Sequence, residues 1–208
     1  MGSVEPGGFY EIRLDLLKPS ELVNPNIDEV FRTGARLIAT FRPLPDGSGA
    51  AAETTRLAVL QRAVGAGAAY VDIELDAPTA HRAAILATAK AHGCPVIISY
   101  HDFEGTPARD AMIDIIERSK AGGGDLVKIA CQVNSPDDCA RLLGLLDGRP
   151  DLVVTGMGPL GRIVRLAAPL LGSPFTYAAP DDGPLTAPGQ IRAGELEQII
   201  QQIDSLSS

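Results

Sequence analysis

Short apolar segments alternate along the chain with longer segments of helical periodicity, and this alternation limits the available folds more than any other feature. The segments with the β-branched and apolar composition of strands are 10–16, 36–42, 69–75, 95–101, 126–131, 152–155 and 175–178. The segments with the apolar spacing of amphipathic helices are 55–64, 78–91, 108–120, 136–146, 160–171 and 194–206. Strands that alternate with helices pair in parallel, because each helix carries the chain back across the sheet. The sequence therefore predicts an α/β fold with a parallel sheet.

Charged residues within the predicted strands help to distinguish an open sheet from a closed barrel. Glu11, Arg13 and Asp15 occupy alternating positions in one strand, and Asp72 and Glu74 do so in another. Residues two apart point to the same face, whereas strands buried on both faces are almost uniformly apolar. A polar barrel interior or mouth accommodates such charges. No glycine-rich phosphate loop follows the first strand, as a nucleotide-binding open sheet would require. The pattern favours a (β/α)8 TIM-type barrel.

The number of predicted strands is seven, one fewer than a closed barrel of this type needs. The first predicted strand begins at residue 10, so we expect the N-terminal first strand and helix of the barrel to be absent. A chain of 208 residues is long enough for one barrel core, which predicts a single domain over residues 1–208. Residues 1–8 are polar and rich in glycine and proline, and we expect a flexible N-terminal segment there.

Composition and charge exclude several classes of function. The net charge of −8 and the pI of about 4.8 disfavour binding to phosphate backbones and anionic membranes. An aromatic content of 4% offers no stacking platform for nucleic acid, and no apolar run reaches membrane-spanning length. The three cysteines form no C-x-x-C pair and the three histidines lack metal-ligand spacing, so we expect neither a disulfide framework nor a metal site. These properties predict a cytoplasmic protein.

Two residues in the predicted strands are candidates for covalent and proton-transfer chemistry. Lys128 interrupts the apolar segment 126–131, where it either extends its amine to solvent or stays desolvated as a nucleophilic amine. His101 ends the strand 95–101, and catalytic groups gather at the carboxyl ends of barrel strands. A hydrogen-bonded surface histidine is the alternative interpretation. His81 and His92 fall in helical segments, and we expect no catalytic role for them.

Three arginines are candidates for binding an anionic substrate. Arg13 and Arg42 lie within predicted strands, and Arg165 lies near the start of the helical segment 160–171. Taken singly, each fits a structural ion pair, for example Arg13 with Glu11 or Asp72. Several arginines near one end of a barrel would instead bind a carboxylate in bidentate geometry.

Taken in chain order, these segments resemble the type I 3-dehydroquinate dehydratase family, whose members catalyse the third step of the shikimate pathway. The matching segments are EIRLD at 11–15, TFR at 40–42, YVDIEL at 70–75, SYHDF at 99–103 with TP at 106–107, KIA at 128–130, MG at 157–158 with Arg165, GS at 172–173 and APGQI at 187–191. Each segment is short, but the ordered set is specific and runs from about residue 10 to residue 191.

The resemblance implies a mechanism for the candidate residues. Lys128 would form a Schiff base with the C3 ketone of 3-dehydroquinate, and the protonated imine would act as the electron sink. His101 would take a proton from C2 and return one to the departing C1 hydroxyl. Arg165 and Gln190 would hold the substrate carboxylate. The remaining site residues implied by the resemblance, which would contact hydroxyls or order the site, are Glu11, Arg13, Arg42 and Thr186. No metal or organic cofactor is implied, and the family suggests a homodimer.

Two departures from the family pattern concern individual residues. Asp46 stands where the family has a glutamate that partners the catalytic histidine, so we expect Asp46 to take that role. Thr186 stands where a serine is usual and keeps the hydroxyl. A class I aldolase would also use a barrel lysine, but the His-Asp-Phe and Ala-Pro-Gly-Gln segments argue against that class. The remaining alternative is a catalytically impaired barrel that serves as a dehydroquinate-binding sensor or as a structural subunit.

Overall fold

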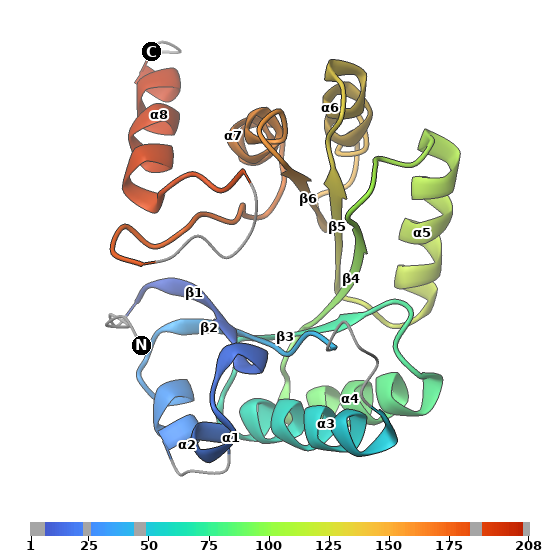
Figure 1. Ribbon diagram of the computed structural model, residues 1–208, viewed down its shortest axis with the longest axis vertical. Helices are drawn as coiled ribbons and strands as arrows, with labels where there is room; N and C mark the ends of the chain where they lie inside the picture. Colours follow the sequence, from blue (N-terminus) through green and yellow to red (C-terminus); the bar gives the residue numbers. More distant parts are fainter. Residues whose placement is uncertain (1–6, 23–25, 44–48, 184–188, 206–208) are drawn as a thin grey trace. The chain divides into compact units, whose positions relative to one another are not determined.

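The structure is a computed structural model that describes residues 7–22, 26–43, 49–183 and 189–205 (Figure 1). The strand order of its sheet follows the chain, β1-β2-β3-β4-β5-β6. The chain divides into two compact units, one of residues 3–98 with 122–125 and the other of residues 99–121 with 126–208. Strand β4 (Val96–Asp102) begins in the first unit and ends in the second. The sheet agrees with the predicted α/β class.

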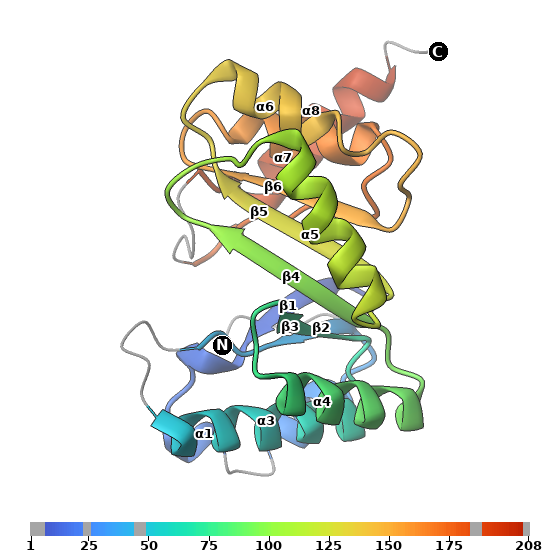
Figure 2. The same cartoon turned by 90° about the vertical axis from the view of Figure 1, so that its right-hand side faces the viewer.

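The first unit holds three parallel strands and the helices that cover them. The strands are β1 (Phe9–Arg13), β2 (Arg36–Thr40) and β3 (Tyr70–Glu74). A 3-10 turn, η1 (Leu14–Leu16), follows β1, and the helices are α1 (Pro19–Leu22), α2 (Asn26–Phe31), α3 (Gly49–Ala66) and α4 (Thr79–His92). All four helices lie on one side of these strands (Figure 2). Leu37 and Ile73 are buried in the core of the unit, and the period of two in each strand leaves polar residues on the other face.

The register of the first unit explains how charged side chains come together on that other face. Thr40 pairs with Arg13 on one side and with Asp72 on the other. Paired residues of parallel strands project to the same face, so the alternating charges predicted from the sequence share one surface of the sheet. Asp72 is fully buried there, which requires compensating partners because an unpaired buried carboxylate is costly.

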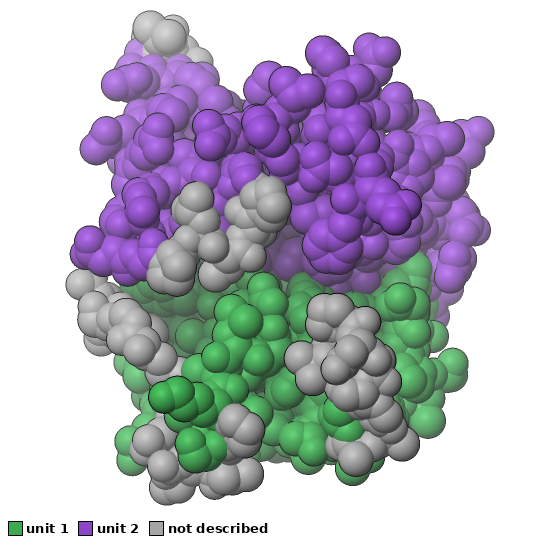
Figure 3. All heavy atoms as spheres, in the orientation of Figure 1, with its two compact units in different colours: residues 1, 3–98, 122–125 green, residues 2, 99–121, 126–208 purple. Residues whose placement is uncertain are grey.

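The second unit, coloured purple in Figure 3, contains the end of β4 and the strands β5 (Leu126–Gln132) and β6 (Leu152–Met157). Its helices are α5 (Arg109–Ala121), α6 (Pro136–Leu143), α7 (Arg162–Leu170) and α8 (Ala193–Ser205). Helix α5 packs on β5, and α6 and α7 pack on β6. Helix α6 begins at a capping box in which the Ser135 hydroxyl accepts from the Asp138 N–H and the Asp138 carboxylate accepts from the Ser135 N–H. Pro136 occupies the first turn, as the sequence indicates.

Six of the predicted strands are confirmed, but the prediction of a strand at 175–178 is wrong. Among the described residues, this part of the chain forms only an isolated bridge between Ala179 and Arg192. The Ala179 N–H donates to the Ile191 carbonyl at 2.8 Å. The segment Phe175–Ala178 has strand composition, yet its side chains and backbone instead serve contacts with α7. The short elements η1, α1 and α2 were not predicted, because three to six residues are too few to show a period.

Candidate active site

Lys128 lies in the middle of β5 and is buried, with 5% of its surface exposed. The register pairs Lys128 with Val153 and Ala130 with Thr155, so the lysine shares a face of the sheet with Thr155 of β6. The interpretation of a lysine that extends to solvent is therefore wrong. The Lys128 Nζ atom lies 4.0 Å from the centroid of the Tyr177 ring, a cation–π distance. The buried position of the amine in an apolar strand agrees with the candidate role of Lys128 as a nucleophile.

His101 lies near the carboxyl end of β4, the strand next to β5 in the sheet. Its ring is half-buried and stacks with Phe103 at a centroid distance of 6.0 Å. The Asp102 carboxylate accepts the N–H groups of Glu104 and Gly105 at 3.0 and 2.9 Å, which turns the chain directly after the histidine. The strand-end position agrees with the sequence prediction, whereas His81 and His92 both lie on helix α4.

Arg165 lies on α7 and is 2% exposed. Its guanidinium donates to the Tyr177 carbonyl at 3.0 Å, and the Thr176 hydroxyl donates to the Arg165 carbonyl at 2.9 Å. Among the described residues no carboxylate pairs with Arg165, and its Nε atom has no hydrogen-bond acceptor there. Burial lowers the pKa of Arg165 to about 10. A buried guanidinium of this kind provides a binding site for an anion.

Gln190 follows a turn that packs directly on the chain after β6. A Cβ atom at Gly189 would lie 2.1 Å from the Gly158 carbonyl oxygen, so only glycine permits this backbone contact. Gly189 also has a φ of 78°, a conformation that favours glycine. Gly189, which precedes Gln190, is thus packed against Gly158, in the turn between β6 and the helix that carries Arg165. Thr186 lies outside the described residues.

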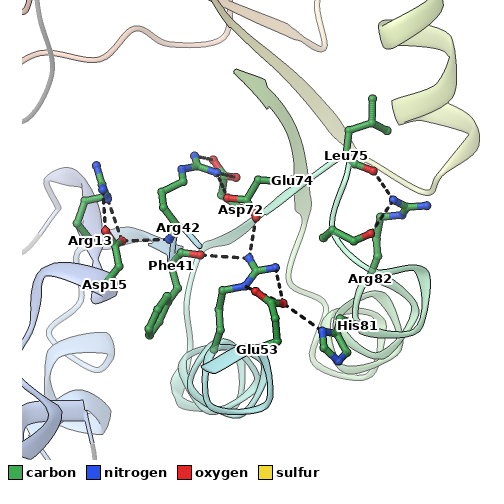
Figure 4. Close-up of polar contacts among 12 residues, drawn as sticks. Arg13, Asp15, Phe41, Arg42, Glu53, Asp72, Glu74, Leu75, His81 and Arg82 are labelled. Atoms are coloured by element: carbon green, nitrogen blue, oxygen red, sulfur yellow. Dashed lines mark hydrogen bonds and ion pairs between the residues drawn. The ribbon is translucent and has the colours of Figure 1, made fainter. Parts of the chain in front are cut away.

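The polar face of the first unit carries the other predicted site residues, of which Arg13 and Arg42 are labelled in Figure 4. The Thr40 hydroxyl donates to Glu11 at 2.8 Å. Arg13 binds Asp15 through two hydrogen bonds of 3.0 and 2.7 Å, so the expected partners Glu11 and Asp72 are wrong for its ion pair. Hydrogen bonds to Asp15 raise the pKa of Arg13. Arg13 pairs with Asp15 because Asp15 follows it by two residues, just after the strand ends.

Arg42 is the most extensively bound of these residues. It contacts both oxygens of Asp72 at 2.8 and 2.7 Å and Glu74 at 2.6 Å. Its backbone N–H donates to Asp15 at 3.1 Å. Burial acts to lower the pKa of Arg42, but Asp72 and Glu74 outweigh burial and raise it above the ordinary value. Arg42 is therefore a fixed cation at the end of β2. Asp46, the expected partner of the catalytic histidine, lies outside the described residues.

The structure thus groups the site residues into two sets, each within one unit. The second unit holds Lys128, His101, Arg165 and Gln190, and the first holds Glu11, Arg13 and Arg42. Sequence reasoning missed Tyr177 and Arg56. No sequence pattern marked Tyr177 as a site residue, apart from its aromatic character two positions after Phe175. Arg56 sits on a helix, where a charged residue usually faces solvent.

Two absences hold for the described part of the chain. No group of three or more histidine, cysteine, aspartate or glutamate side chains there is arranged to hold a metal ion. No helix in the same residues is long and apolar enough to cross a membrane.

Comparison with known proteins identifies the class. The family model for type I 3-dehydroquinase matches residues 6–207. The chain is 37% identical over 199 residues to a 3-dehydroquinate dehydratase of Thermococcus gammatolerans, covering 94% of this chain and 88% of that protein. It is also 37% identical over 206 residues to the 3-dehydroquinate dehydratase of Methanosarcina barkeri, covering 94% of this chain and 85% of that protein.

Solved structures agree with this class. The 3-dehydroquinate dehydratase of Geobacillus kaustophilus superposes with a TM-score of 0.80 at 25% identity, over 95% of this chain and 81% of that one. The enzyme of the same name from Aquifex aeolicus superposes with a TM-score of 0.77 at 29% identity, over 93% and 87%. The chain belongs to the type I 3-dehydroquinase family.

Proposed function

We propose that this protein is a type I 3-dehydroquinate dehydratase, a hydro-lyase that eliminates water from 3-dehydroquinate through a Schiff base. Membership of the family supports the reaction. The observation that carries the assignment of residues is the buried Lys128 amine, which lies 4.0 Å from the Tyr177 ring on a segment held by Arg165. The presence of both side chains in the same unit supports the proposal that Lys128 is the nucleophile and that Arg165 binds an anionic group.

In the proposed mechanism, the Lys128 amine attacks the C3 carbonyl of 3-dehydroquinate and a water molecule leaves to give a protonated imine. His101 then takes a proton from C2, and the electron pair moves into the imine. As the C1–O bond breaks, His101 returns a proton to the departing hydroxyl, which leaves as water. A second water molecule hydrolyses the imine, which releases 3-dehydroshikimate and regenerates the amine. The net reaction is the loss of one water molecule, and no cofactor takes part.

The family resemblance supplies the proposed substrate contacts. Arg165 and Gln190 would hold the carboxylate, because Arg165 is a buried cation with no carboxylate partner among the described residues. Glu11, Arg13, Arg42 and Thr186 would contact hydroxyl groups or order the site. Asp46 would partner His101 in place of the glutamate usual in the family.

We propose further that the two units form one domain with the topology of a (β/α)8 TIM-type barrel. The similarity to 3-dehydroquinate dehydratase structures, which covers 95% of the chain for the Geobacillus enzyme, supports this topology. We also propose a cytoplasmic homodimer that acts on a small molecule and binds neither nucleic acid nor membranes. The family resemblance supports the dimer, and sedimentation analysis of the purified protein tests it.

Replacing Lys128 with alanine tests the assignment against the alternative of a dehydroquinate sensor. Turnover is followed by the ultraviolet absorbance of the conjugated product, and binding by calorimetry. An enzyme of this mechanism loses turnover in Lys128→Ala. A wild-type protein that binds dehydroquinate without turnover, and a variant that binds it equally well, would favour the sensor.

A further inference from the structure

Arg56 is a buried cation on the helix behind the polar face of the first unit. It lies on α3 and is 3% exposed. Its guanidinium donates to the Glu74 carboxylate at 2.6 Å, to the Phe41 carbonyl at 3.2 Å and to the Glu53 carboxylate at 3.1 Å. Each of these partners is a strong acceptor, so the guanidinium is fixed in orientation as well as in position.

Two of these acceptors adjoin Arg42 directly. Phe41 precedes Arg42 in the chain, and the hydrogen bond to its carbonyl fixes the backbone at the end of β2. Glu74 binds Arg42 through Oε1 at 2.6 Å and Arg56 through Oε2 at 2.6 Å. One carboxylate thus bridges two guanidinium groups (Figure 4), and its orientation depends on both.

The charges around Arg42 show why a second cation is needed. Asp72 is fully buried and Glu74 nearly so, and both bind the single guanidinium of Arg42. Without Arg56, Glu74 would lose one of its two guanidinium partners while it remains close to Asp72, and like charges at short range repel each other. Arg56 supplies the second positive charge from the far side of Glu74. This leaves the Arg42 side chain in one defined position.

The outer end of the network reaches the surface of the unit. Glu53 accepts from Arg56 and lies 3.1 Å from the Nδ1 atom of His81. Burial acts to raise the pKa of Glu53, but hydrogen bonds from Arg56 and His81 outweigh it and lower that pKa. Glu53 therefore stays ionised and anchors the guanidinium of Arg56 on the helix side.

We infer that Arg56 is a positioning residue for the proposed reaction, which acts through Glu74 and the Phe41 carbonyl to orient Arg42 toward the substrate. The inference rests on the proposed function, in which Arg42 contacts substrate hydroxyls or orders the site. It assigns Arg56 no contact with the substrate. If Arg56 only fastened α3 to the sheet, its loss would change stability and leave the Michaelis constant unchanged.

The test compares Arg56→Met, Arg56→Lys and the control Arg62→Met in the full chain. Arg62 lies on the same helix and pairs with Asp28 at 2.8 Å, away from Glu74. For each variant, kcat and KM for 3-dehydroquinate are measured together with the thermal midpoint. Activity is referred to the concentration of folded protein.

In Arg56→Met we expect KM to rise by about tenfold or more, the effect of one weakened charge-assisted hydrogen bond, while kcat changes less than threefold. Arg56→Lys should recover part of this loss, because the ammonium restores the charge beside Glu74 but cannot reproduce the planar set of donors. Arg62→Met should keep the wild-type KM.

Wild-type KM in Arg56→Met, with or without a lowered midpoint, would overturn the inference. If Arg56→Met does not fold, Arg56→Lys decides, because a wild-type KM in that variant would have the same meaning. A wild-type protein without turnover would instead overturn the proposed function on which the inference rests. The two failures are therefore distinguishable.

Discussion

Replacing Arg165 with methionine should weaken catalysis while leaving the ligand-free protein at least as stable as the wild type. Arg165 is 2% exposed and has no carboxylate partner among the described residues. A structural arginine in an ion pair would behave in the opposite way, because its loss leaves a buried charge without a partner. The variant therefore separates a residue kept for an anionic ligand from one kept for folding.

The size of the stability effect follows from the pKa of Arg165, which burial lowers to about 10. Relative to the ordinary value, this corresponds to roughly 3 kcal/mol by which the fold disfavours the charged form. The cost is fully present at neutral pH, where the guanidinium is charged, and is relieved only as the pH rises above about 10. Methionine removes this cost but loses the hydrogen bond to the Tyr177 carbonyl at 3.0 Å, which is worth about 1–3 kcal/mol when a buried group is left unsatisfied. The net change lies between about zero and a gain of about 2 kcal/mol.

In contrast to stability, substrate binding should weaken in Arg165→Met. A charge-assisted hydrogen bond to a carboxylate contributes about 1.5–3 kcal/mol, so kcat/KM for 3-dehydroquinate should fall by roughly 10- to 150-fold. Urea unfolding at pH 7.5 measures the first effect, and initial rates measure the second. Arg162→Met is the matched control, because Arg162 is exposed on the same helix and should change neither quantity.

A large loss of stability in Arg165→Met with an unchanged kcat/KM would contradict the role of Arg165 in substrate binding. That result would mean that Arg165 serves the packing of α7 on the segment around Tyr177 and binds no substrate.

Three further predictions concern other groups. Tyr177→Leu should lower kcat/KM by about 2- to 30-fold through loss of the cation–π contact with Lys128, whereas Tyr177→Phe should retain most activity; equal rates in both variants would contradict this. Burial acts to raise the pKa of Asp15, but hydrogen bonds from Arg13 and the Arg42 backbone lower it. The stability that Asp15 contributes is therefore present above its ordinary pKa and lost as the pH falls through the lowered value. Asp15→Asn should be less stable by about 1–3 kcal/mol at pH 7 and should approach the wild type under strong acid in urea titrations. Burial raises the pKa of Cys131 to about 12, so iodoacetamide at pH 8 should label it only after unfolding, and rapid labelling of the native protein would show that the thiol is accessible.

Much of the fold could be predicted from the sequence because the period of each element was long enough to read. Strands 96–102 and 126–132 and helices such as α4 and α5 agree with the predicted segments to within one or two residues. The segment 175–178 failed because strand composition does not guarantee a hydrogen-bonded neighbour. There the chain is held by Arg165, through the Tyr177 carbonyl and the Thr176 hydroxyl. Such contacts connect residues distant in sequence and leave no local pattern.

In the candidate site, too, residues with a local sequence pattern could be predicted, and residues that depend on distant contacts could not. Lys128 and His101 could be identified because a lysine or histidine within an apolar strand is conspicuous, and the structure places both on strands. Arg56 could not be identified, because its burial depends on the packing of α3 behind the polar face of the sheet. The partner of Arg13 was also mistaken, since the choice between Asp15 and Asp72 depends on where β1 ends.

The most direct test of the proposed function is borohydride reduction in the presence of 3-dehydroquinate, read by peptide mass spectrometry. The proposed mechanism predicts a reduced adduct on the peptide that contains Lys128, together with formation of the conjugated product in the unreduced reaction. A folded protein that yields product without an adduct on Lys128 would contradict the Schiff-base mechanism. A folded protein that yields neither would contradict the assignment as a dehydratase.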